Sequence, residues 1–328
     1  MERLRIVSGI RPTGPLHLGH YLGVLRNWVR LQQDYECFYF VADWHALTSE
    51  YKEPSIITDS TRSLVRTWLS VGIDPDKTVV FRQSDIKAHS ELFLLLSMIT
   101  PLTWLERNPT YKELRNELKE KDLGTFGFLG YPVLQAADIV MYHADKVPIG
   151  EDQLPHLELT REIARRFNFI YGEKILKEPK EILTQAPKVP GLDGRKMSKS
   201  YNNAILINET PESLKQKVMQ MLTDVKRKTK RDPGEPRDCN LYPFHEYFTD
   251  EETRKEIASG CRNATMGCVE CKKILIKNIE REFSPIWEKL SYYRSRDSLV
   301  DDVLRQGAEK ASEIAEATMT RVRGVMHV

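Results

Sequence analysis

The sequence predicts an α/β protein: a doubly wound parallel sheet, followed by a second domain that is α-helical. Patterns typical of strands alternate with patterns typical of helices in the first half of the chain. The run ECFYFVA at residues 36–42 is apolar throughout, as in strands that a sheet buries on both faces. After Pro190 helix patterns continue and clear strand patterns stop. In a sheet of this kind, ligands bind beyond the carboxyl ends of the strands.

The individual elements follow from local patterns. Pro15 stands near the first position of a predicted helix, where its missing N–H costs nothing. The charged run YKELRNELKEKD at residues 111–122 predicts a solvated helix, part of an insertion at about 105–125 between two halves of the sheet. The predicted strands are 4–9, 36–42 and 78–81, and the predicted helices are 15–33, 56–71 and 88–99.

Length and composition limit the possibilities. A chain of 328 residues holds about two domains, and we place them at 1–190 and 191–328, with the C-terminal helix as a candidate to pack back. The 49 basic and 47 acidic residues nearly cancel, so anions must bind at local clusters. No apolar signal core opens the chain and no stretch approaches the roughly 18 apolar residues of a membrane span, which predicts a cytoplasmic protein. There the five cysteines stay reduced, so a group of them indicates a metal site before disulfides.

Residues 14–23, GPLHLGHYLG, place two histidines three positions apart in the first turns of the predicted first helix. This spacing puts His17 and His20 on one face, near free N–H groups and the positive end of the helix dipole, which suits a phosphate. Gly14 and Gly19 let a ligand approach closely. The alternative is a pair of ordinary histidines on a partly exposed helix.

A second motif, GLDGRKMSKS at residues 191–200, combines glycines with cations and hydroxyls. Point charges and donors on such a loop suit a polyphosphate. The alternative is a solvated lysine loop, which is what a K-x-x-K spacing alone would indicate. The donors that we expect to act on phosphate are Lys196, Ser198, Lys199 and Ser200.

Together, the two motifs resemble the paired HIGH and KMSKS signatures of class I aminoacyl-tRNA synthetases. The segments SGIRPTGPLHLGHYLG, ADWHALT, YPVLQAADIVMYHADKVPIGEDQ and TDVKRKTKRDPGEP extend the resemblance over nearly the whole chain, to the bacterial-type tryptophanyl-tRNA synthetases. The resemblance implies a Rossmann-like catalytic domain, a helical anticodon-binding domain and a homodimer. It also implies ATP-dependent formation of tryptophanyl-adenylate and pyrophosphate, followed by transfer to tRNA(Trp), with Mg²⁺ accompanying ATP.

The resemblance assigns residues to the ATP site as well. His17 and His20 would stabilise phosphate charge, and Lys196 and Lys199 would attract the departing pyrophosphate. Because this chemistry forms no covalent enzyme intermediate, catalysis would consist of positioning and electrostatic stabilisation. The residues that the resemblance assigns to ATP are Arg11, Pro12, Thr13, Gly19, His20, Gly150, Glu151, Asp152, Val189, Lys196, Met197, Ser198, Lys199 and Ser200.

The choice of amino acid depends first on AADIVMY at residues 136–142, where Asp138 stands among apolar neighbours. A buried carboxylate needs a donor, and an indole N–H can only donate. The alternative is an aspartate that faces solvent or pairs with a lysine. By the resemblance, Tyr131 and Gln153 hold the ammonium and carboxylate end of tryptophan. His45 would line the pocket, with a structural histidine at a strand end as the alternative.

Three further positions bear on whether the substrate is tryptophan or tyrosine. Tyrosine enzymes usually carry a tyrosine two residues before the glycine that matches Gly9, and here that residue is Val7. Gln135 departs from many bacterial relatives, which have a methionine packed on the indole at this place. We therefore assign all three residues to the tryptophan pocket and leave the lining around Gln135 open.

Five cations occupy six positions at residues 226–231, next to the turn DPG at 232–234. A solvated loop is the ordinary explanation of such a run. The segment matches the part that the family uses near the anticodon, so we expect it to follow the RNA backbone. The predicted tRNA-binding residues are Lys226, Arg227, Lys228, Lys230 and Arg231.

Four of the five cysteines fall in one part of the second domain, spaced C-x21-C-x6-C-x2-C, whereas Cys37 stands apart in a predicted strand and belongs to the core. Four thiolates complete a metal shell. The single close pair and the resemblance favour a [4Fe–4S] cluster, with zinc and buried free thiols as alternatives. The predicted ligands are Cys239, Cys261, Cys268 and Cys271.

Two classes of function compete with a tryptophan–tRNA ligase. A catalytically silent paralogue that binds nucleotide and RNA in a regulatory role would need neither HLGH nor KMSKS intact. A tyrosine–tRNA ligase and a small-molecule adenylyltransferase both use H-x-G-H. The basic, cysteine-bearing second domain disfavours the adenylyltransferase.

Overall fold

A computed structural model describes residues 3–109, 111–112, 122–183, 189–199 and 201–328. Internal contacts divide the chain into two compact units. Unit 1 consists of Met1–Gly14, Asn27–Gln185 and Arg296–Val328, and unit 2 of Pro15–Arg26 and Ala186–Ser295. The division into domains 1–190 and 191–328 stays a prediction, and the predicted charged helix at 111–122 lies largely outside the described residues.

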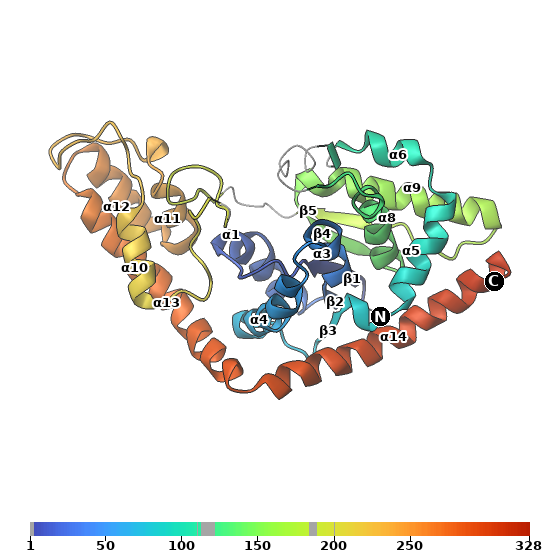
Figure 1. Ribbon diagram of the computed structural model, residues 1–328. Helices are drawn as coiled ribbons and strands as arrows, with labels where there is room; N and C mark the ends of the chain where they lie inside the picture. The colour runs from blue at the N-terminus through green and yellow to red at the C-terminus, as the bar shows by residue number, and fades with distance from the viewer. Residues whose placement is uncertain (1–2, 110, 113–121, 184–188, 200) are drawn as a thin grey trace. The chain divides into compact units, whose positions relative to one another are not determined.

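Unit 1 is built on a five-stranded parallel sheet with the strand order β3-β2-β1-β4-β5, which confirms the predicted fold class (Figure 1). The order reverses between β1 and β4, and ligands of such sheets bind at that point, beyond the carboxyl ends of the strands. The core strand β2 pairs in register with both neighbours. The strands are β1 (Arg5–Ile10), β2 (Glu36–Val41), β3 (Thr78–Arg82), β4 (Lys146–Ile149) and β5 (Lys180–Leu183).

Helices cover the sheet and bury its apolar side chains. α4 ends at Gly72, whose φ of 109° is the left-handed conformation that suits a glycine at a helix end. Trp28 stacks on Tyr39 with ring centroids 4.0 Å apart, and both are buried in the core of unit 1. The elements are α3 (Asp43–Glu50), α4 (Ser55–Val71), η2 (Gln83–Asp85), α5 (Ala88–Ile99), α6 (Leu102–Arg107), α8 (Phe126–Val140), η3 (Glu151–Gln153) and α9 (Leu154–Tyr171).

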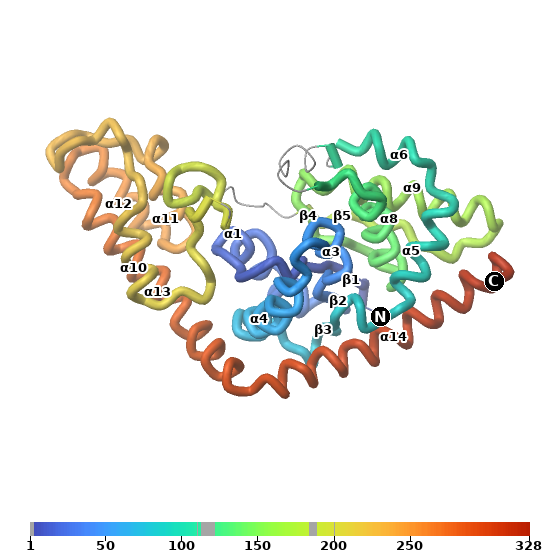
Figure 2. Tube along the Cα trace, viewed as in Figure 1, coloured from blue at the N-terminus to red at the C-terminus, as the bar shows by residue number. Residues whose placement is uncertain are grey.

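The C-terminal helix α14 (Asp297–Met326) belongs to unit 1 and packs against β3 (Figures 1 and 2). Its sheet-facing residues are small or apolar, among them Ala311, Ala315 and Met319, all 0 % exposed. At Gly307 the helix touches the strand so closely that an added Cβ would lie 1.8 Å from the carbonyl oxygen of Val80. The glycine is therefore required by the approach of two backbones.

The first predicted helix begins later than expected. Helix α1 is Leu18–His20, a π-helical turn η1 follows at Tyr21–Leu25, and α2 covers Arg26–Leu31. Pro15 is not in the first turn, because the backbone before the helix is extended and paired elsewhere: Leu18 N–H donates to the Ile205 carbonyl at 2.9 Å. This pairing fastens the HLGH segment to unit 2.

Unit 2 is mainly helical in its described residues, as predicted. They contain isolated bridges but no named strand. Helix α13 carries two of the predicted cysteine ligands at its start. The elements are α10 (Pro211–Gln220), η4 (Pro236–Asp238), α11 (Tyr242–Phe248), α12 (Glu251–Arg262) and α13 (Cys268–Arg294). Among the described residues, no helix has the length and apolar character needed to cross a membrane.

Candidate active site

The two histidines of HLGH face each other at the start of α1, with ring centroids 4.0 Å apart. His17 Nδ1 accepts the N–H of Gly19 at 3.1 Å, and His20 Nδ1 accepts the N–H of His17 at 3.3 Å. Each neutral ring therefore carries its proton on Nε2 and presents that N–H as a donor. Sequence analysis predicted free backbone N–H groups here as phosphate donors. In the structure, the N–H groups of His17 and Gly19 donate to the two rings instead, so the donors left for a phosphate are the imidazoles.

Burial keeps both rings neutral at pH 7. Burial, aided by the charge of Lys199, lowers the pKa of His17 to about 4. Burial, aided by His17 and Lys199, lowers the pKa of His20 to about 3. Because Lys199 acts on both rings, the structure brings HLGH and the KMSKS motif together within unit 2. The combination of two neutral N–H donors and a lysine suits developing negative charge on phosphate.

Asn203, which sequence analysis missed, fixes the backbone of the KMSKS loop. Its Oδ1 accepts the N–H of Ser198 at 2.8 Å, and its Nδ2 donates to Asp193 at 2.7 Å and to the Lys196 carbonyl at 3.2 Å. The side chain is buried, and an added Cβ on Gly191 would meet it at 2.1 Å. An asparagine just after a glycine-rich loop is a turn signal that could have marked it.

In the rest of the KMSKS segment, the central methionine is buried and the lysine before it is exposed. Met197 is buried, and its N–H donates to the Val189 carbonyl at 3.3 Å. Lys196 is exposed. Ser200 lies outside the described residues. The buried Met197 therefore anchors the loop, while the neighbouring side chain of Lys196 is exposed.

In unit 1, Asp138 on α8 is buried and accepts hydrogen bonds from two neighbouring side chains. Gln83 Nε2 donates to both of its oxygens, at 2.7 and 2.8 Å, and His89 Nδ1 lies 2.7 Å from Oδ1. Burial raises the pKa of this carboxyl, and the bonds from His89 and Gln83 oppose that rise. The alternative of a solvent-facing aspartate is excluded, since only 2 % of Asp138 is exposed.

A second buried group surrounds Tyr131, also on α8. Its hydroxyl lies 3.0 Å from His156 Nε2, and His156 Nδ1 lies 3.4 Å from Asn108 Nδ2. The ring of His45 packs edge-on against Tyr131 with centroids 5.3 Å apart. Burial is the main cause that lowers the pKa of His45 to about 3, and the charges of Arg11 and His156 lower it further. His156 and Asn108 were missed because nothing in their local sequence marks them.

Arg11 follows β1 and reaches toward α3. It donates to Ser49 and lies 3.6 Å from the Glu50 carboxylate. Its Nε is buried and has no hydrogen-bond partner among the described residues. An unmatched buried donor of this kind is costly unless a ligand accepts from it. The neighbouring Pro12 is buried and Thr13 is half-buried.

The remaining predicted residues of unit 1 lie within β1, after β4 and on α8. Gly150 precedes η3, in which Glu151 and Asp152 are exposed, and Gln153 Nε2 donates to Asp152 at 2.8 Å. Gly9 is needed because an added Cβ would lie 2.7 Å from the Phe40 ring. Val7 is 0 % exposed and part of the core, and Gln135 is half-buried on α8.

Residues 1–284 match the model of the protein family described as tRNA synthetases class I (W and Y). The chain belongs to this family. It is 53 % identical to the tryptophan–tRNA ligase of Thermotoga maritima over 99 % of both chains, and 45 % identical to that of Aquifex aeolicus over 99 % of this chain and 100 % of the other. The crystal structure of tryptophanyl-tRNA synthetase from Campylobacter jejuni complexed with ADP and tryptophan superimposes with a TM-score of 0.89 at 32 % identity, covering 99 % of this chain and 100 % of that one.

The basic run of this class I synthetase chain is only partly open to a ligand. Lys228, Lys230 and Arg231 are exposed, and Lys226 is exposed but lies 2.6 Å from Asp238. Arg227 is half-buried and turns inward, where its guanidinium donates to the Met266 carbonyl at 2.7 Å and lies 3.8 Å from Cys261 Sγ. The run therefore presents three exposed cations to solvent, beside the ion-paired Lys226, and directs Arg227 toward the cysteines.

The four cysteines line one cavity of about 20 Å³ in unit 2. His245 Nε2 lies 3.2 Å from Cys271 Sγ, and Arg227 reaches Cys261 and Cys268. Among the described residues, however, no group of three or more His, Cys, Asp or Glu side chains is spaced to hold a metal ion. Cys37 is 0 % exposed in the unit 1 core, as predicted.

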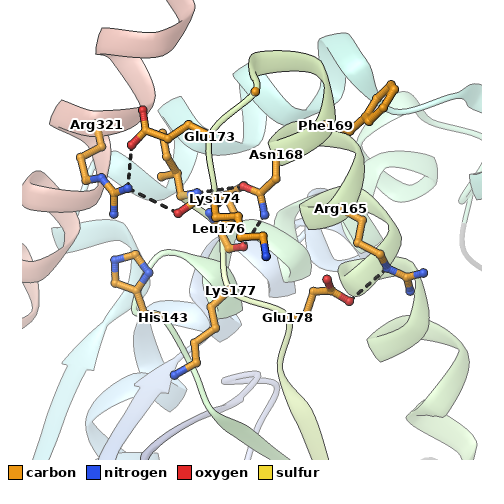
Figure 3. Close-up of a pocket in the computed structure, with 12 residues that line it drawn as sticks. His143, Arg165, Asn168, Phe169, Glu173, Lys174, Leu176, Lys177, Glu178 and Arg321 are labelled. Atoms are coloured by element: carbon orange, nitrogen blue, oxygen red, sulfur yellow. Dashed lines mark hydrogen bonds and ion pairs between the residues drawn. The ribbon is translucent and has the colours of Figure 1, made fainter.

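A cavity of about 910 Å³ lies at the opposite, amino end of the sheet in unit 1, where His143 precedes β4 (Figure 3). Its cations are mostly paired: Arg321 lies 2.8 Å from Glu173, and Arg165 lies 3.0 Å from Glu178. None of the residues predicted for ATP or tryptophan lines it. The cavity is therefore separate from the candidate active site.

Proposed function

We propose that the protein is a tryptophan–tRNA ligase, which joins L-tryptophan to tRNA(Trp) with ATP and releases AMP and pyrophosphate. The observation that carries this proposal is the 53 % identity, over 99 % of both chains, to a tryptophan–tRNA ligase. The buried acceptor Asp138 supports an indole as the bound ring, because an indole N–H can donate to it. Val7 also leaves no hydroxyl at the place where tyrosine enzymes usually bond the phenol.

In the proposed reaction, the carboxylate of tryptophan attacks the α-phosphate of ATP, and the bond to pyrophosphate breaks. The Nε2–H groups of His17 and His20 would donate to phosphate oxygens as their charge grows. Lys196 and Lys199 would stabilise the departing pyrophosphate. Mg²⁺ would accompany ATP and neutralise phosphate charge. The chain thus contributes donors and charges placed before the reaction starts.

On the substrate side, we assign the ammonium and carboxylate end of tryptophan to Tyr131 and Gln153, with His45 beside them. The contacts of Tyr131 with His45 and His156 support this assignment, because they hold its ring and hydroxyl in place. The unmatched Nε of Arg11 supports a contact of the segment 11–13 with ATP. The other residues assigned to ATP and tryptophan by resemblance are kept as part of the proposal.

The test is ATP–pyrophosphate exchange measured separately with tryptophan, tyrosine and phenylalanine. Exchange that depends on tryptophan is expected. Exchange with tyrosine alone would make the protein a tyrosine ligase. No exchange with any of the three, together with binding of tRNA, would favour the regulatory paralogue. Light scattering on the purified protein tests the homodimer that the resemblance implies.

We also propose that Cys239, Cys261, Cys268 and Cys271 bind a metal through four thiolates, as a [4Fe–4S] cluster or, alternatively, zinc. Their shared cavity supports a common ligand. The guanidinium of Arg227, which approaches Cys261 and Cys268, supports an anionic one, because such donors stabilise thiolates. A cavity of about 20 Å³ has the size of a single atom, so a cluster would require the cysteine side chains to spread.

Metal analysis after purification without oxygen decides between the two. A brown protein with about four irons per chain is the expected result, and a colourless one with a single zinc would replace the cluster while keeping the site. Cys268→Ser should lower the metal content, whereas Cys37→Ala, in the core of unit 1, should leave it unchanged. Full tRNA charging by a metal-free quadruple serine variant would show that neither a cluster nor a structural role of this site is needed for the reaction.

Lys228, Lys230 and Arg231 are proposed as the residues of the basic run that follow the tRNA backbone, because their side chains are exposed. Lys226 joins them when its exposed ion pair with Asp238 opens, which costs little. Arg227 contributes indirectly, since its guanidinium holds the run against the cysteine cavity. Neutralising the three exposed cations should weaken tRNA binding and reduce its dependence on salt.

A further inference from the structure

Four buried side chains of unit 1 form a continuous hydrogen-bonded chain that ends on Asp138. His89 lies at its centre, with Nδ1 at 2.7 Å from Asp138 Oδ1 and Nε2 at 2.6 Å from the Tyr142 hydroxyl. Gln83 closes the other side of the carboxylate. Gln83, His89 and Tyr142 are 0 % exposed, so none of these groups exchanges its partner for water. Satisfied networks of this kind hold their members in one arrangement.

The direction of each bond follows from the chemistry of the groups. Gln83 Oε1 accepts the backbone N–H of His45 at 3.1 Å, which turns the amide so that Nε2 points at Asp138. An ionised carboxylate only accepts, so His89 must donate through Nδ1. Its Nε2 is then the acceptor in a neutral ring, and the Tyr142 hydroxyl donates to it. Tyr142 thereby selects the tautomer of His89 that can serve Asp138.

A count of acceptor positions shows what the network leaves open. A carboxylate offers about four lone-pair positions. Gln83 and His89 fill three of them. One remains, and it can accept one N–H. Rings pack around the network: the centroids of Phe40 and Phe81 each lie 6.1 Å from that of His89, which leaves the imidazole little room to turn away.

We propose that His89, in the tautomer selected by Tyr142, is a positioning residue that keeps Asp138 as an acceptor for the N–H of the substrate ring. The inference rests on the proposed function, in which that substrate is tryptophan. Without the Tyr142 hydroxyl, His89 can move its proton to Nε2 and face Asp138 with a lone pair. Two acceptors would then oppose each other at 2.7 Å, and the carboxylate would turn or take up a proton.

Tyr142→Phe is the sharpest test, because it removes one buried oxygen that does not touch Asp138. Tyr39→Phe is its matched control: Tyr39 is also 0 % exposed in unit 1, and its hydroxyl donates to the Trp28 carbonyl at 3.2 Å, outside the network. The measurement is pyrophosphate exchange with L-tryptophan and with 3-benzothienyl-alanine, which has the same shape but no N–H. The quantity to compare is the ratio of kcat/KM for the two substrates.

The wild-type protein should prefer tryptophan, and Tyr142→Phe should reduce that preference at least about tenfold, the effect of one charge-assisted hydrogen bond. The loss should appear as a higher KM for tryptophan with kcat little changed, while kcat/KM for the analogue stays within about twofold. His89→Asn, whose amide can still donate near the Nδ1 position, should retain more of the preference than His89→Phe. Tyr39→Phe should keep the wild-type ratio.

The results of this experiment distinguish a failure of the role given to His89 and Tyr142 from a failure of the proposed function. If the wild-type protein does not distinguish tryptophan from the analogue, Asp138 is not the acceptor and the proposed assignment fails with it. If the wild-type protein distinguishes them and Tyr142→Phe keeps the full ratio, Asp138 stands and the role of His89 and Tyr142 is wrong. A variant that loses both substrates equally, or a control that loses the ratio, indicates damage to the core and also overturns the inference.

Discussion

Gly307→Ala in α14 should destabilise unit 1, although alanine is the better helix former. The added Cβ would lie 1.8 Å from the Val80 carbonyl oxygen and 2.5 Å from its carbonyl carbon. Both atoms belong to the backbone of β3, so no side-chain rotation relieves the clash. To reach 3.4 Å, the lower limit of an ordinary contact, the helix and strand must separate by about 1.6 Å.

The size of this separation determines how much unfolding free energy is lost. A gap of about 1 Å already forfeits up to half of the dispersion energy of the contacts it opens, and Ala311 and Ala315 pack in the same row. Overpacking of this kind costs about 1–3 kcal/mol, and we expect the upper end here because the neighbour is backbone. Alanine returns about 1 kcal/mol of helix propensity. The net loss of unfolding free energy should be about 2 kcal/mol.

Gly324→Ala is the matched control in the same helix, since its Cβ would meet nothing within 4 Å. It should stabilise by about 0.5 kcal/mol, being close to the helix end. Urea unfolding followed by tryptophan fluorescence measures both, because four of the five tryptophans (Trp28, Trp44, Trp68 and Trp104) belong to unit 1. Equal, stabilising effects of the two substitutions would refute the close packing of α14 on β3.

Three further predictions concern the candidate active site. Lys199→Ala and His20→Ala should each lower kcat of tryptophan-dependent pyrophosphate exchange by about 10²–10³ with little change in KM for tryptophan, and full activity in either would exclude the phosphate role. Asn203→Ala should release the KMSKS loop and lower kcat/KM for ATP by about tenfold, whereas unchanged kinetics would mean that the loop is held by other contacts. Burial lowers the pKa of His156 to about 4, below its value of about 6.5 in the unfolded chain, so its contribution to stability is complete above pH 6.5 and lost as the pH falls toward 4, at up to about 1.4 kcal/mol per pH unit. Urea titrations at several pH values should show this acid slope in the wild-type protein and a smaller slope in His156→Gln; equal slopes would contradict it.

The sheet was predictable where the sequence determines structure locally. The apolar run at 36–42 became the interior strand β2, and helices α4 and α5 carry the bounds Ser55–Val71 and Ala88–Ile99, close to those predicted. The first helix was misplaced because its start is decided by pairing with Ile205, a residue almost 190 positions away in the chain. Local patterns carry no record of such a contact.

Some residues of the candidate site were likewise predictable from the sequence, and others were not. Motifs with a fixed spacing led to His17, His20 and Lys199, and a single carboxylate in an apolar helix led to Asp138. Their partners could not be found by these means. Gln83, His89 and His156 come from three separate segments, and each is ordinary in its own sequence context. Only the fold brings them to α8, which is why the supporting network emerged from the structure alone.

The assignment of residues to the two units has a consequence for the proposed chemistry. A division at residue 190 would separate HLGH from KMSKS. In the structure the segment Pro15–Arg26 belongs to unit 2, and the backbone pairing of His17 with Leu206 fastens it there. The histidines and Lys199 therefore keep their mutual geometry as one body. Asp138, Tyr131 and their partners form a second body in unit 1. The groups that we propose for recognition of the amino acid and for stabilisation of phosphate charge thus belong to different units, so substitutions in one group should leave the internal geometry of the other intact.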